Sequence, residues 1–271
     1  MTTTENIFDN FKFTMSGLEK GLQVIHITTP AAQLLCCQHD ENIEAVLTRP
    51  DLNPFDQIPV KENETIIGLL KRRERRECSD GAKGLARDCM QPLGEKILVS
   101  VDTPLLDFIQ NDSLDRIVIG GTNIYGLVTR SDLLKLPVFL LGFALVTHVE
   151  TLMLNLIRAT GVSEDKWLTW VNEKRIKRDF NRLFSQRADT DMLGVTQFFD
   201  KKEILEHLAV LKEYTSQLPD KDFVEQLEEI RKLRNTVAHT GNTDDSDDIL
   251  QTFIDRLRIT YEWIKNIERR Q

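Results

Sequence analysis

The residues best suited to chemistry lie near position 235, where Arg234 and Asn235 are followed by His239. Arginine is always charged and can hold two phosphate oxygens at once, while histidine exchanges a proton near neutral pH. Arg231, Asn235 and His239 recur every four residues, so on a helix they share one flank. Arg234 lies at the edge of the apolar face on the same side. The pattern predicts a polar flank that can bind a phosphodiester.

These groups are suited to cleaving RNA without a metal ion. A base removes the proton of a ribose 2′-hydroxyl, which attacks the adjacent phosphate, and an acid protonates the leaving 5′-oxygen. His239 fits either role, and Arg234 would stabilise the charge that develops on the phosphate. The expected products carry a 2′,3′-cyclic phosphate, or its opened form, and a 5′-hydroxyl. Arg234, His239 and Asn235 are the candidate catalytic residues, and Arg231 is a candidate RNA contact.

The elements that must position these residues are helices. After Leu136-Pro137 nearly all of the chain has helical periodicity, which places a domain boundary there and predicts an all-α up-and-down bundle over residues 138–271. Five helices are expected, starting near Phe139, at Ser163 (and running through Phe184), at a cap on Asp200 (with Leu211 on its inner face), at Pro219-Asp220, and at the acidic run 244–248. The fourth carries the arginine and the histidine and ends at Gly241. Its core stripe consists of Leu227, Ile230, Leu233 and Val237.

The segment Leu233-Arg234-Asn235-Thr236-Val237-Ala238-His239 resembles the R-x(4–6)-H signature of the HEPN family of helical domains, many of which are ribonucleases. The resemblance implies a homodimer through the helical domain, with both copies of Arg234 and His239 facing one cleft. It also relates His148 and Glu150 to polar positions that face this cleft in some members. A role as a toxin or in antiviral defence is implied by the family alone.

The chain before the boundary reads as one α+β unit written twice, with a β-α-β-β-α order that recurs after about 70 residues. The first copy is expected to contain a strand over 24–27, a helix from Thr28 through Leu35, a second helix over 41–47 and strands over 57–60 and 65–70. The second is expected to contain a strand over 97–101, a helix through Ile109 and strands over 116–119 and 123–128. Thr129 or Ser131 is expected to cap the last helix.

The end of the second copy carries a family motif. The segment Gly126-Leu127-Val128-Thr129-Arg130-Ser131-Asp132-Leu133 is similar to the G-h-h-T-x-x-D-h ending of CBS domains. Residues 1–137 thus resemble a tandem CBS pair, with copies at about 20–77 and 95–137. In the first copy the matching segment, 68–74, lacks the threonine and has Glu74 in place of the aspartate. One competent ligand site per chain is therefore expected.

The CBS resemblance implies an adenine nucleotide as a regulatory ligand. By this resemblance Thr129 reaches a phosphate, Asp132 accepts the ribose hydroxyl protons, and the backbone near Val101 and Thr103 holds the base. ATP, AMP, S-adenosylmethionine and a signalling oligonucleotide all remain open as ligands. The basic run 71–76 has two interpretations, a phosphate contact or a solvated helix end or loop.

The cysteines and the overall charge bound the class of protein. Cys36 and Cys37 are adjacent, which suits neither a disulfide framework nor a zinc site, so these two and Cys78 and Cys89 are expected to be reduced thiols. The net charge of -8 disfavours non-specific nucleic-acid binding, so an RNA substrate would have to be held locally. The start of the chain lacks the pattern of a signal peptide, and the apolar run 138–146 is too short to span a bilayer. A cytoplasmic protein without a membrane segment is expected.

Together these patterns predict a ligand-regulated, metal-independent endoribonuclease. An adenine-nucleotide sensor would control a dimeric helical active site, and the short junction at residues 133–137 would couple the two. The alternative is a non-catalytic adaptor, in which the same sensor controls a helical interaction domain and Arg234 and His239 serve binding or structure. Nucleotidyl or phosphoryl transfer is less favoured, because the chain has no glycine-rich phosphate loop.

Overall fold

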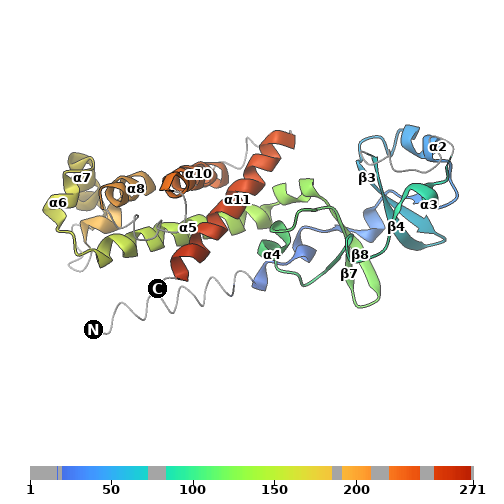
Figure 1. The fold of residues 1–271 in the computed structure, drawn as a ribbon, viewed down its shortest axis with the longest axis horizontal. Coiled ribbons are helices and arrows are strands. Elements are labelled where there is room, and N and C mark those ends of the chain that lie inside the picture. The colour runs from blue at the N-terminus through green and yellow to red at the C-terminus, as the bar shows by residue number, and fades with distance from the viewer. Residues whose placement is uncertain are drawn as a thin grey trace. The chain divides into compact units, whose positions relative to one another are not determined.

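The computed structural model describes residues 17, 20–72, 84–184, 191–208, 220–238 and 247–269 (Figure 1). The chain forms two compact units, Met1–Val138 and Phe139–Gln271. The first contains short strands and short helices, and the second contains helices, so the expected order of an α+β region followed by a helical region is confirmed. The division lies beside the boundary expected at Leu136-Pro137.

Two four-stranded sheets form the first unit. The first sheet has the order β2 (Cys37–Gln38), β3 (Gln57–Glu62), β4 (Thr65–Lys71) and β5 (Gln91–Pro92), and the second has the order β6 (Leu98–Ser100), β7 (Arg116–Gly120), β8 (Asn123–Val128) and β1 (Thr29–Pro30). Each has a central antiparallel hairpin with a parallel strand on one side and an antiparallel strand on the other. The hairpins shift register at equivalent places, between Val60 and Lys61 and between Val118 and Ile119. The expected internal repeat is confirmed.

The outer antiparallel strands are exchanged between the two copies. β1 lies near the start of the first copy but pairs with β8 of the second, and β5 lies just before the second copy but pairs with β4 of the first. A Cβ atom at Gly126 would lie 2.0 Å from the Thr29 carbonyl oxygen, and one at Gly68 would lie 2.5 Å from the Gln91 carbonyl oxygen. Glycine is required at both places because any side chain would push the exchanged strand away.

Short helices connect the strands: η1 (Val24–His26), η2 (Ala31–Gln33), α2 (Ile43–Thr48), α3 (Ala86–Cys89), α4 (Leu105–Ile109) and η5 (Arg130–Leu134). Thr129 is the N-cap of η5, as one of the two expected alternatives had it. The strand expected over 24–27 is wrong, because these residues form η1. The helix expected from Thr28 through Leu35 is also wrong. Thr29 precedes a proline, which favours extended backbone, and it pairs with Leu127 in the second sheet.

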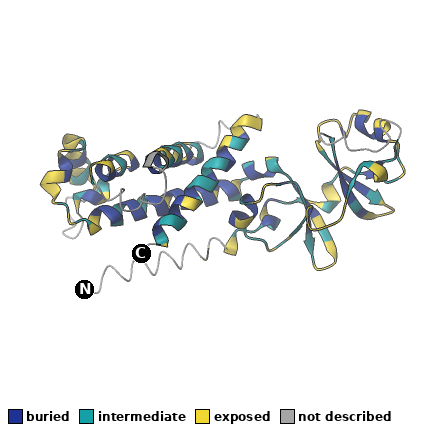
Figure 2. Ribbon diagram, viewed as in Figure 1, coloured by how far each residue is buried: buried dark blue, intermediate teal, exposed yellow. Residues whose placement is uncertain are grey.

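The core of the first unit has two parts. One lies within the first copy and contains Cys37, Ile43, Val46, Leu47, Leu52, Ile58, Val60, Leu70 and Ala86. The other joins Ile66 and Leu69 of the first copy to Ile97, Ile117 and Leu127 of the second. Figure 2 shows buried stretches of this unit in dark blue, in strands as well as in helices. The copies therefore share apolar packing as well as strands.

Helices build the second unit: α5 (Leu136–Ala159), α6 (Glu164–Leu168), α7 (Glu173–Phe184), η6 (Met192–Val195), α8 (Phe198–His207), α10 (Asp220–Ala238) and α11 (Asp247–Glu268). α5, α10 and α11 meet where Gly142 lies against Val237 and Leu257. The rings of Phe139 and Phe253 stack with centroids 5.2 Å apart, so α5 and α11 are in direct contact.

Two expectations for this unit are wrong. The single helix expected from Ser163 to Phe184 is broken into α6 and α7, because the Asn172 side chain accepts a hydrogen bond from the Arg175 backbone and starts a new helix. Asp200 does not cap α8 as its first residue. It lies in the first turn and accepts a hydrogen bond from the Gln197 backbone at 2.7 Å. The expectations at Leu211 and Gly241 lie outside the described residues.

α5 is longer than the apolar run 138–146 that was expected to be a buried helix. Within the described part of the chain it is the one helix whose length and composition would allow it to cross a membrane. In its most apolar stretch 56% of the residues are buried inside the structure, and a core helix passes the same test. Leu140 and Phe143 on its outer face are exposed.

Candidate functional site

The motif that ends the second copy brings Thr129 and Asp132 into direct contact. Asp132 lies in η5, directly after β8, and is only 8% exposed. Its Oδ2 accepts hydrogen bonds from the Thr129 backbone N–H at 2.6 Å and from Thr129 Oγ1 at 3.0 Å. Thr129 Oγ1 also lies 2.9 Å from Ser131 Oγ. The two predicted ligand residues form a capping box, which fixes the carboxylate at the end of the hairpin.

The other carboxylate oxygen is held by residues that the sequence did not single out. Lys135 Nζ lies 2.7 Å from Asp132 Oδ1, and Thr29 Oγ1 donates to the same oxygen at 3.5 Å. Lys135 Nζ also donates to the Ile27 carbonyl at 2.6 Å. We call Thr29, Thr129, Ser131, Asp132 and Lys135 the Asp132 cluster. It combines hydroxyl groups, a carboxylate and an ammonium group, which are the groups that recognise a ribose diol and a phosphate.

The predicted backbone contacts to a base are occupied by the protein itself. Val101 N–H donates to the Ile119 carbonyl at 2.8 Å, and the Val101 carbonyl accepts from Ile25 N–H at 3.2 Å. The Thr103 carbonyl accepts from Val24 N–H at 2.9 Å. Val101 and Thr103 therefore hold η1 in place, which explains why residues 24–26 leave the extended conformation.

At the equivalent end of the first copy, a side chain fills the available acceptors. The Arg72 guanidinium donates to the carbonyls of Leu47, Leu52 and Phe55 at 2.8, 3.1 and 3.1 Å. Arg72 therefore stabilises its own copy, and both interpretations of the basic run are wrong for this residue. Residues 73–76 of that run lie outside the described residues.

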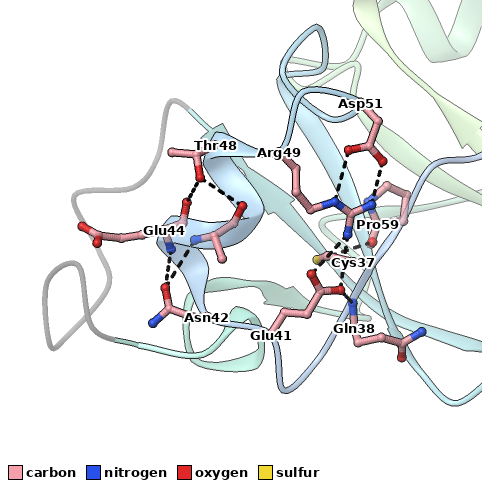
Figure 3. Close-up of polar contacts among 10 residues, drawn as sticks. Cys37, Gln38, Glu41, Asn42, Glu44, Thr48, Arg49, Asp51 and Pro59 are labelled. Atoms are coloured by element: carbon pink, nitrogen blue, oxygen red, sulfur yellow. Dashed lines mark hydrogen bonds and ion pairs between the residues drawn. The ribbon is translucent and has the colours of Figure 1, made fainter.

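A second structural cluster keeps the first copy together (Figure 3). Arg49 binds Glu41 on one side and Asp51 on the other, with closest distances of 3.1 and 2.7 Å. Glu41 in turn accepts from the Gln38 backbone at 2.6 Å. The Asn42 side chain caps α2 through the Glu44 backbone N–H. These charges are satisfied locally and form part of the scaffold.

The cysteines differ from the expectation in one respect. Cys36 and Cys37 are free, but Cys89 is disulfide-bonded, so a fully reduced set is wrong. Cys78 lies outside the described residues. Burial raises the pKa of the Cys37 thiol to about 12, and the Glu41 carboxylate adds to the effect. Cys37 is therefore a packing residue of the first core.

A polar contact joins the two copies beside the hairpin ends. Gln57 Nε2 donates to Asp115 Oδ2 at 2.8 Å, and the Arg130 backbone donates to Asp115 Oδ1 at 3.2 Å. Burial raises the pKa of the Asp115 carboxyl, while the charges of Lys71 and Arg130 oppose the rise. Asp115 is a half-buried acid that accepts hydrogen bonds from both copies of the repeat.

In the helical unit, α10 carries the predicted stripe as expected. Leu227, Ile230, Leu233 and Val237 are buried. Arg231 lies on the flank, but its guanidinium is bound by Glu228 through Nε and a terminal nitrogen. Arg234 and Asn235 are exposed, whereas His239 lies outside the described residues. The described part of the predicted catalytic set is thus Arg234 and Asn235.

Glu150 holds Arg234 from a neighbouring helix. Arg234 Nε donates to Glu150 Oε1 at 3.2 Å, and Lys201 Nζ of α8 lies 3.5 Å from Glu150 Oε2. Lys201 is buried and donates to the Thr196 carbonyl at 2.5 Å. Burial lowers the pKa of Lys201, and Glu150 opposes this. The Arg234 side chain is 46% exposed, and its terminal nitrogens make no hydrogen bond within the described part of the chain.

His148 has a different place from the one implied by the HEPN resemblance. It is buried on α5, and its Nε2 lies 2.9 Å from Glu268 Oε1 on α11. His148 therefore joins two core helices. Glu150, two residues further along α5, instead reaches the exposed Arg234. Within the residues described, no group of three or more His, Cys, Asp or Glu side chains is arranged to hold a metal ion.

Comparisons with known proteins find likeness in structure only. No family model and no curated protein matches the chain. The chain is similar to the CBS domain of a bacterial CNNM/CorC-family Mg²⁺ transporter in complex with ATP, at 19% identity over 46% of this chain and 92% of that one, with a TM-score of 0.35. It is also similar to a CBS-domain pair with bound AMP from Klebsiella pneumoniae, at 19% identity over 42% of this chain and 95% of that one, with a TM-score of 0.33.

A third similar structure is CBSX2, a CBS-pair protein of Arabidopsis thaliana, in complex with AMP. The identity is 18%, the match covers 41% of this chain and 92% of that one, and the TM-score is 0.35. Each of the three matches covers less than half of this chain.

Proposed function

We propose that this chain is a nucleotide-sensing regulatory protein, in which the N-terminal unit binds an adenine nucleotide and the helical unit carries the response. The observation that supports this best is the Asp132 cluster. It places a carboxylate, hydroxyl groups and the Lys135 ammonium group within hydrogen-bonding distance of one another. The choice of adenine follows the CBS resemblance of residues 126–133 and the AMP and ATP held by the similar proteins.

The chemistry of binding follows from the contacts of Asp132. A ribose diol would donate both of its protons to the carboxylate, as Lys135 and Thr129 now do. Lys135, released from Asp132 Oδ1, would be available to a phosphate. The first copy lacks the matching threonine and aspartate, and Arg72 at the end of its hairpin is bound to three carbonyls of its own copy. We therefore propose one nucleotide per chain.

Calorimetric titration of the full chain with ATP and with AMP tests this function. Replacing Asp132 by alanine removes the diol acceptor, and hydrogen bonds to a charged group are worth about 1.5–3 kcal/mol, so we expect an affinity loss of roughly tenfold or more. Asp112→Ala, at an exposed aspartate of the same unit, is the matched control. Circular dichroism checks that both variants fold. No binding of either nucleotide by the wild type, or equal binding by Asp132→Ala, contradicts the proposal.

A second candidate function is metal-independent RNA cleavage by the helical unit. Its support is Arg234, an exposed guanidinium that Glu150 orients through Nε while the terminal nitrogens point to no other described group. These nitrogens would bind a scissile phosphate, and His239 would move the proton between the 2′-hydroxyl and the 5′-oxygen. The exposed Leu140 and Phe143 of α5 favour a homodimer through this unit.

Cleavage of a labelled single-stranded RNA in EDTA, with and without ATP or AMP, tests the second function. We expect His239→Ala to slow cleavage by about 100-fold or more, since general acid–base catalysis contributes that much. Arg234→Ala should slow it by about as much, since removing one group that stabilises transition-state charge has an effect of similar size. Lys232→Ala, on the same helix, should cut at the wild-type rate. If the wild type leaves the RNA intact under all conditions, the helical unit is the non-catalytic output of the sensor.

A further inference from the structure

Helix α7 has a charge opposite to that of the chain as a whole. The protein has a net charge of -8, but α7 contains five cations and two carboxylates. Of these cations, Lys174, Lys177, Arg178 and Arg182 are exposed, and we call them the α7 basic face. Their spacings of three, one and four residues correspond to less than half a turn around the helix axis, so they project from one side of the helix.

The charges of this face are only weakly neutralised. The Arg178 and Arg182 side chains are 73% and 72% exposed, and each reaches the same carboxylate, Asp179, at 3.4 and 3.9 Å. Lys177 pairs with Glu173 of the preceding turn. Lys174 makes no ion pair within the described ranges. Exposed pairs of this kind contribute little to stability, so the face is not explained by a need to hold the fold.

An aromatic residue lies shortly before α7 in the chain. Trp170, which precedes α7, stacks on the His207 ring with centroids 5.1 Å apart and an angle of 11° between the planes. Lys166 Nζ lies 5.9 Å from the centre of the Trp170 ring. The Trp170 side chain is partly exposed. A flat, partly exposed ring beside cations can stack on a nucleic-acid base.

Ion pairs connect α7 to the candidate phosphate-binding arginine. Arg175 of α7 binds Asp200 of α8, and the next residue, Lys201, binds Glu150. Glu150 in turn holds Arg234. Neighbouring residues of α8 thus anchor the basic helix on one side and the Arg234 contact on the other.

We infer that the α7 basic face, together with Trp170 shortly before the helix, binds single-stranded nucleic acid through its phosphates and one stacked base. Phosphates fit the row of exposed cations, and a base fits the flat ring, which an acidic polypeptide would not need. The inference deepens the proposed RNA cleavage by naming where the strand is held, and it rests on that function only for the choice of RNA.

Binding of a fluorescein-labelled 2′-O-methyl oligouridine to the full chain in EDTA, followed by anisotropy, tests the inference. This strand cannot be cut by attack of a 2′-hydroxyl, so binding is measured apart from cleavage. Arg178→Glu combined with Arg182→Glu should weaken binding by roughly tenfold or more at about 0.1 M salt. The dependence of log Kd on log salt concentration should become shallower by about 0.7 for each lost phosphate contact. Trp170→Leu should weaken binding while leaving that slope unchanged.

The matched control is Arg87→Glu combined with Lys96→Glu, which makes the same change in net charge at exposed cations of the N-terminal unit. It should bind within about twofold of the wild type, because electrostatic contacts at the surface are local at ordinary salt. Equal loss in the control, or an unchanged salt slope in the α7 variant, overturns the inference. Competition by polyglutamate as strong as that by unlabelled strand also overturns it, in favour of an acidic protein partner.

The two proposals fail in different ways. If the oligouridine binds through α7 but natural RNA is not cut, the surface stands and the catalytic function fails. If RNA is cut at an unchanged rate by the Arg178→Glu, Arg182→Glu variant and the oligouridine does not bind, the catalytic function stands and the surface fails. Single-stranded DNA should bind within a few fold of RNA, because the proposed contacts are to phosphates and a base face.

Discussion

The two copies of the N-terminal repeat have the same strand arrangement, but different side chains follow their hairpins. Their hairpins have the same register shift, the same glycine facing an exchanged strand and the same parallel neighbour. In the first copy the hairpin leads to Arg72, which fills three carbonyl acceptors of its own copy. In the second it leads to Thr129 and Asp132, whose polar groups are gathered in the Asp132 cluster. The two copies thus differ by only a few side chains at this position. In the first copy these side chains bind the protein's own carbonyls, and in the second they form a candidate ligand site.

The largest expected effect comes from the exchanged strands. Gly126→Ala should lower the free energy of unfolding by about 3 kcal/mol, since its Cβ would lie 2.0 Å from the Thr29 carbonyl oxygen and the strand would have to move. Gly68→Ala should cost somewhat less, because the equivalent distance is 2.5 Å. Urea unfolding measures both. Gly94→Ala, with its nearest atom at 3.9 Å, is the control, and an equal loss there would refute the steric argument.

The second largest effect is expected from removing the Arg72 side chain. Arg72→Ala leaves the carbonyls of Leu47, Leu52 and Phe55 without their donor, so we expect a loss of about 2 kcal/mol in the free energy of unfolding. Arg116→Ala, which removes two longer or more exposed bonds to carbonyls, should cost clearly less. If the two substitutions lower the free energy of unfolding equally, as measured with urea, the three Arg72 contacts do not have the expected stabilising role.

The smallest expected effect concerns the acid between the copies and depends on pH. Burial raises the pKa of Asp115, so its neutral form stabilises the folded protein below the unfolded pKa, and this stability is lost as pH rises through the folded pKa. Asp115→Asn should therefore be more stable than the wild type at pH 7, by about 0.5 kcal/mol after allowance for partial exposure, and this gain should vanish near pH 3. Thermal unfolding at both pH values measures it.

A gain from Asp115→Asn that is independent of pH would contradict the ionisation argument. The oxygen of the new amide would still accept the hydrogen bond from the Arg130 backbone, while its NH2 group would donate to Gln57 Oε1 after the Gln57 amide turns over. Asp56→Asn, at another acid of this region, is the comparison, because the charge of Asp56 also raises the pKa of Asp115.

The sequence predicted the parts of the fold that depend on local pattern. The hairpin strands, α4 and α10 follow alternating or helical spacing of apolar residues, and the repeat follows from their order. β1 was missed because a two-residue strand has no pattern of its own and exists only through pairing with β8. The break between α6 and α7 was missed because the Asn172 cap is a single side chain within an otherwise helical pattern.

The candidate sites show the same limit. Thr129 and Asp132 were found because a local motif contains both. Lys135, three residues after Asp132, could have been found from its spacing, but Thr29 could not, since it is separated from Asp132 by 103 positions. Glu150 reaches Arg234 across 84 positions, and Lys201 comes from a further helix. Contacts between distant segments require the tertiary structure.

The exchange of β1 and β5 has a consequence for how the repeat can be divided. If the chain were cut between the copies, the first fragment would keep β1, which belongs to the sheet of the second fragment. The second fragment would keep β5, which belongs to the sheet of the first. An unpaired sheet edge tends to recruit a strand, and here each fragment carries the strand that the other lacks. The fragments should therefore reassociate without a covalent link, so that the duplicated unit behaves as a self-complementing split protein and neither copy as an independent module.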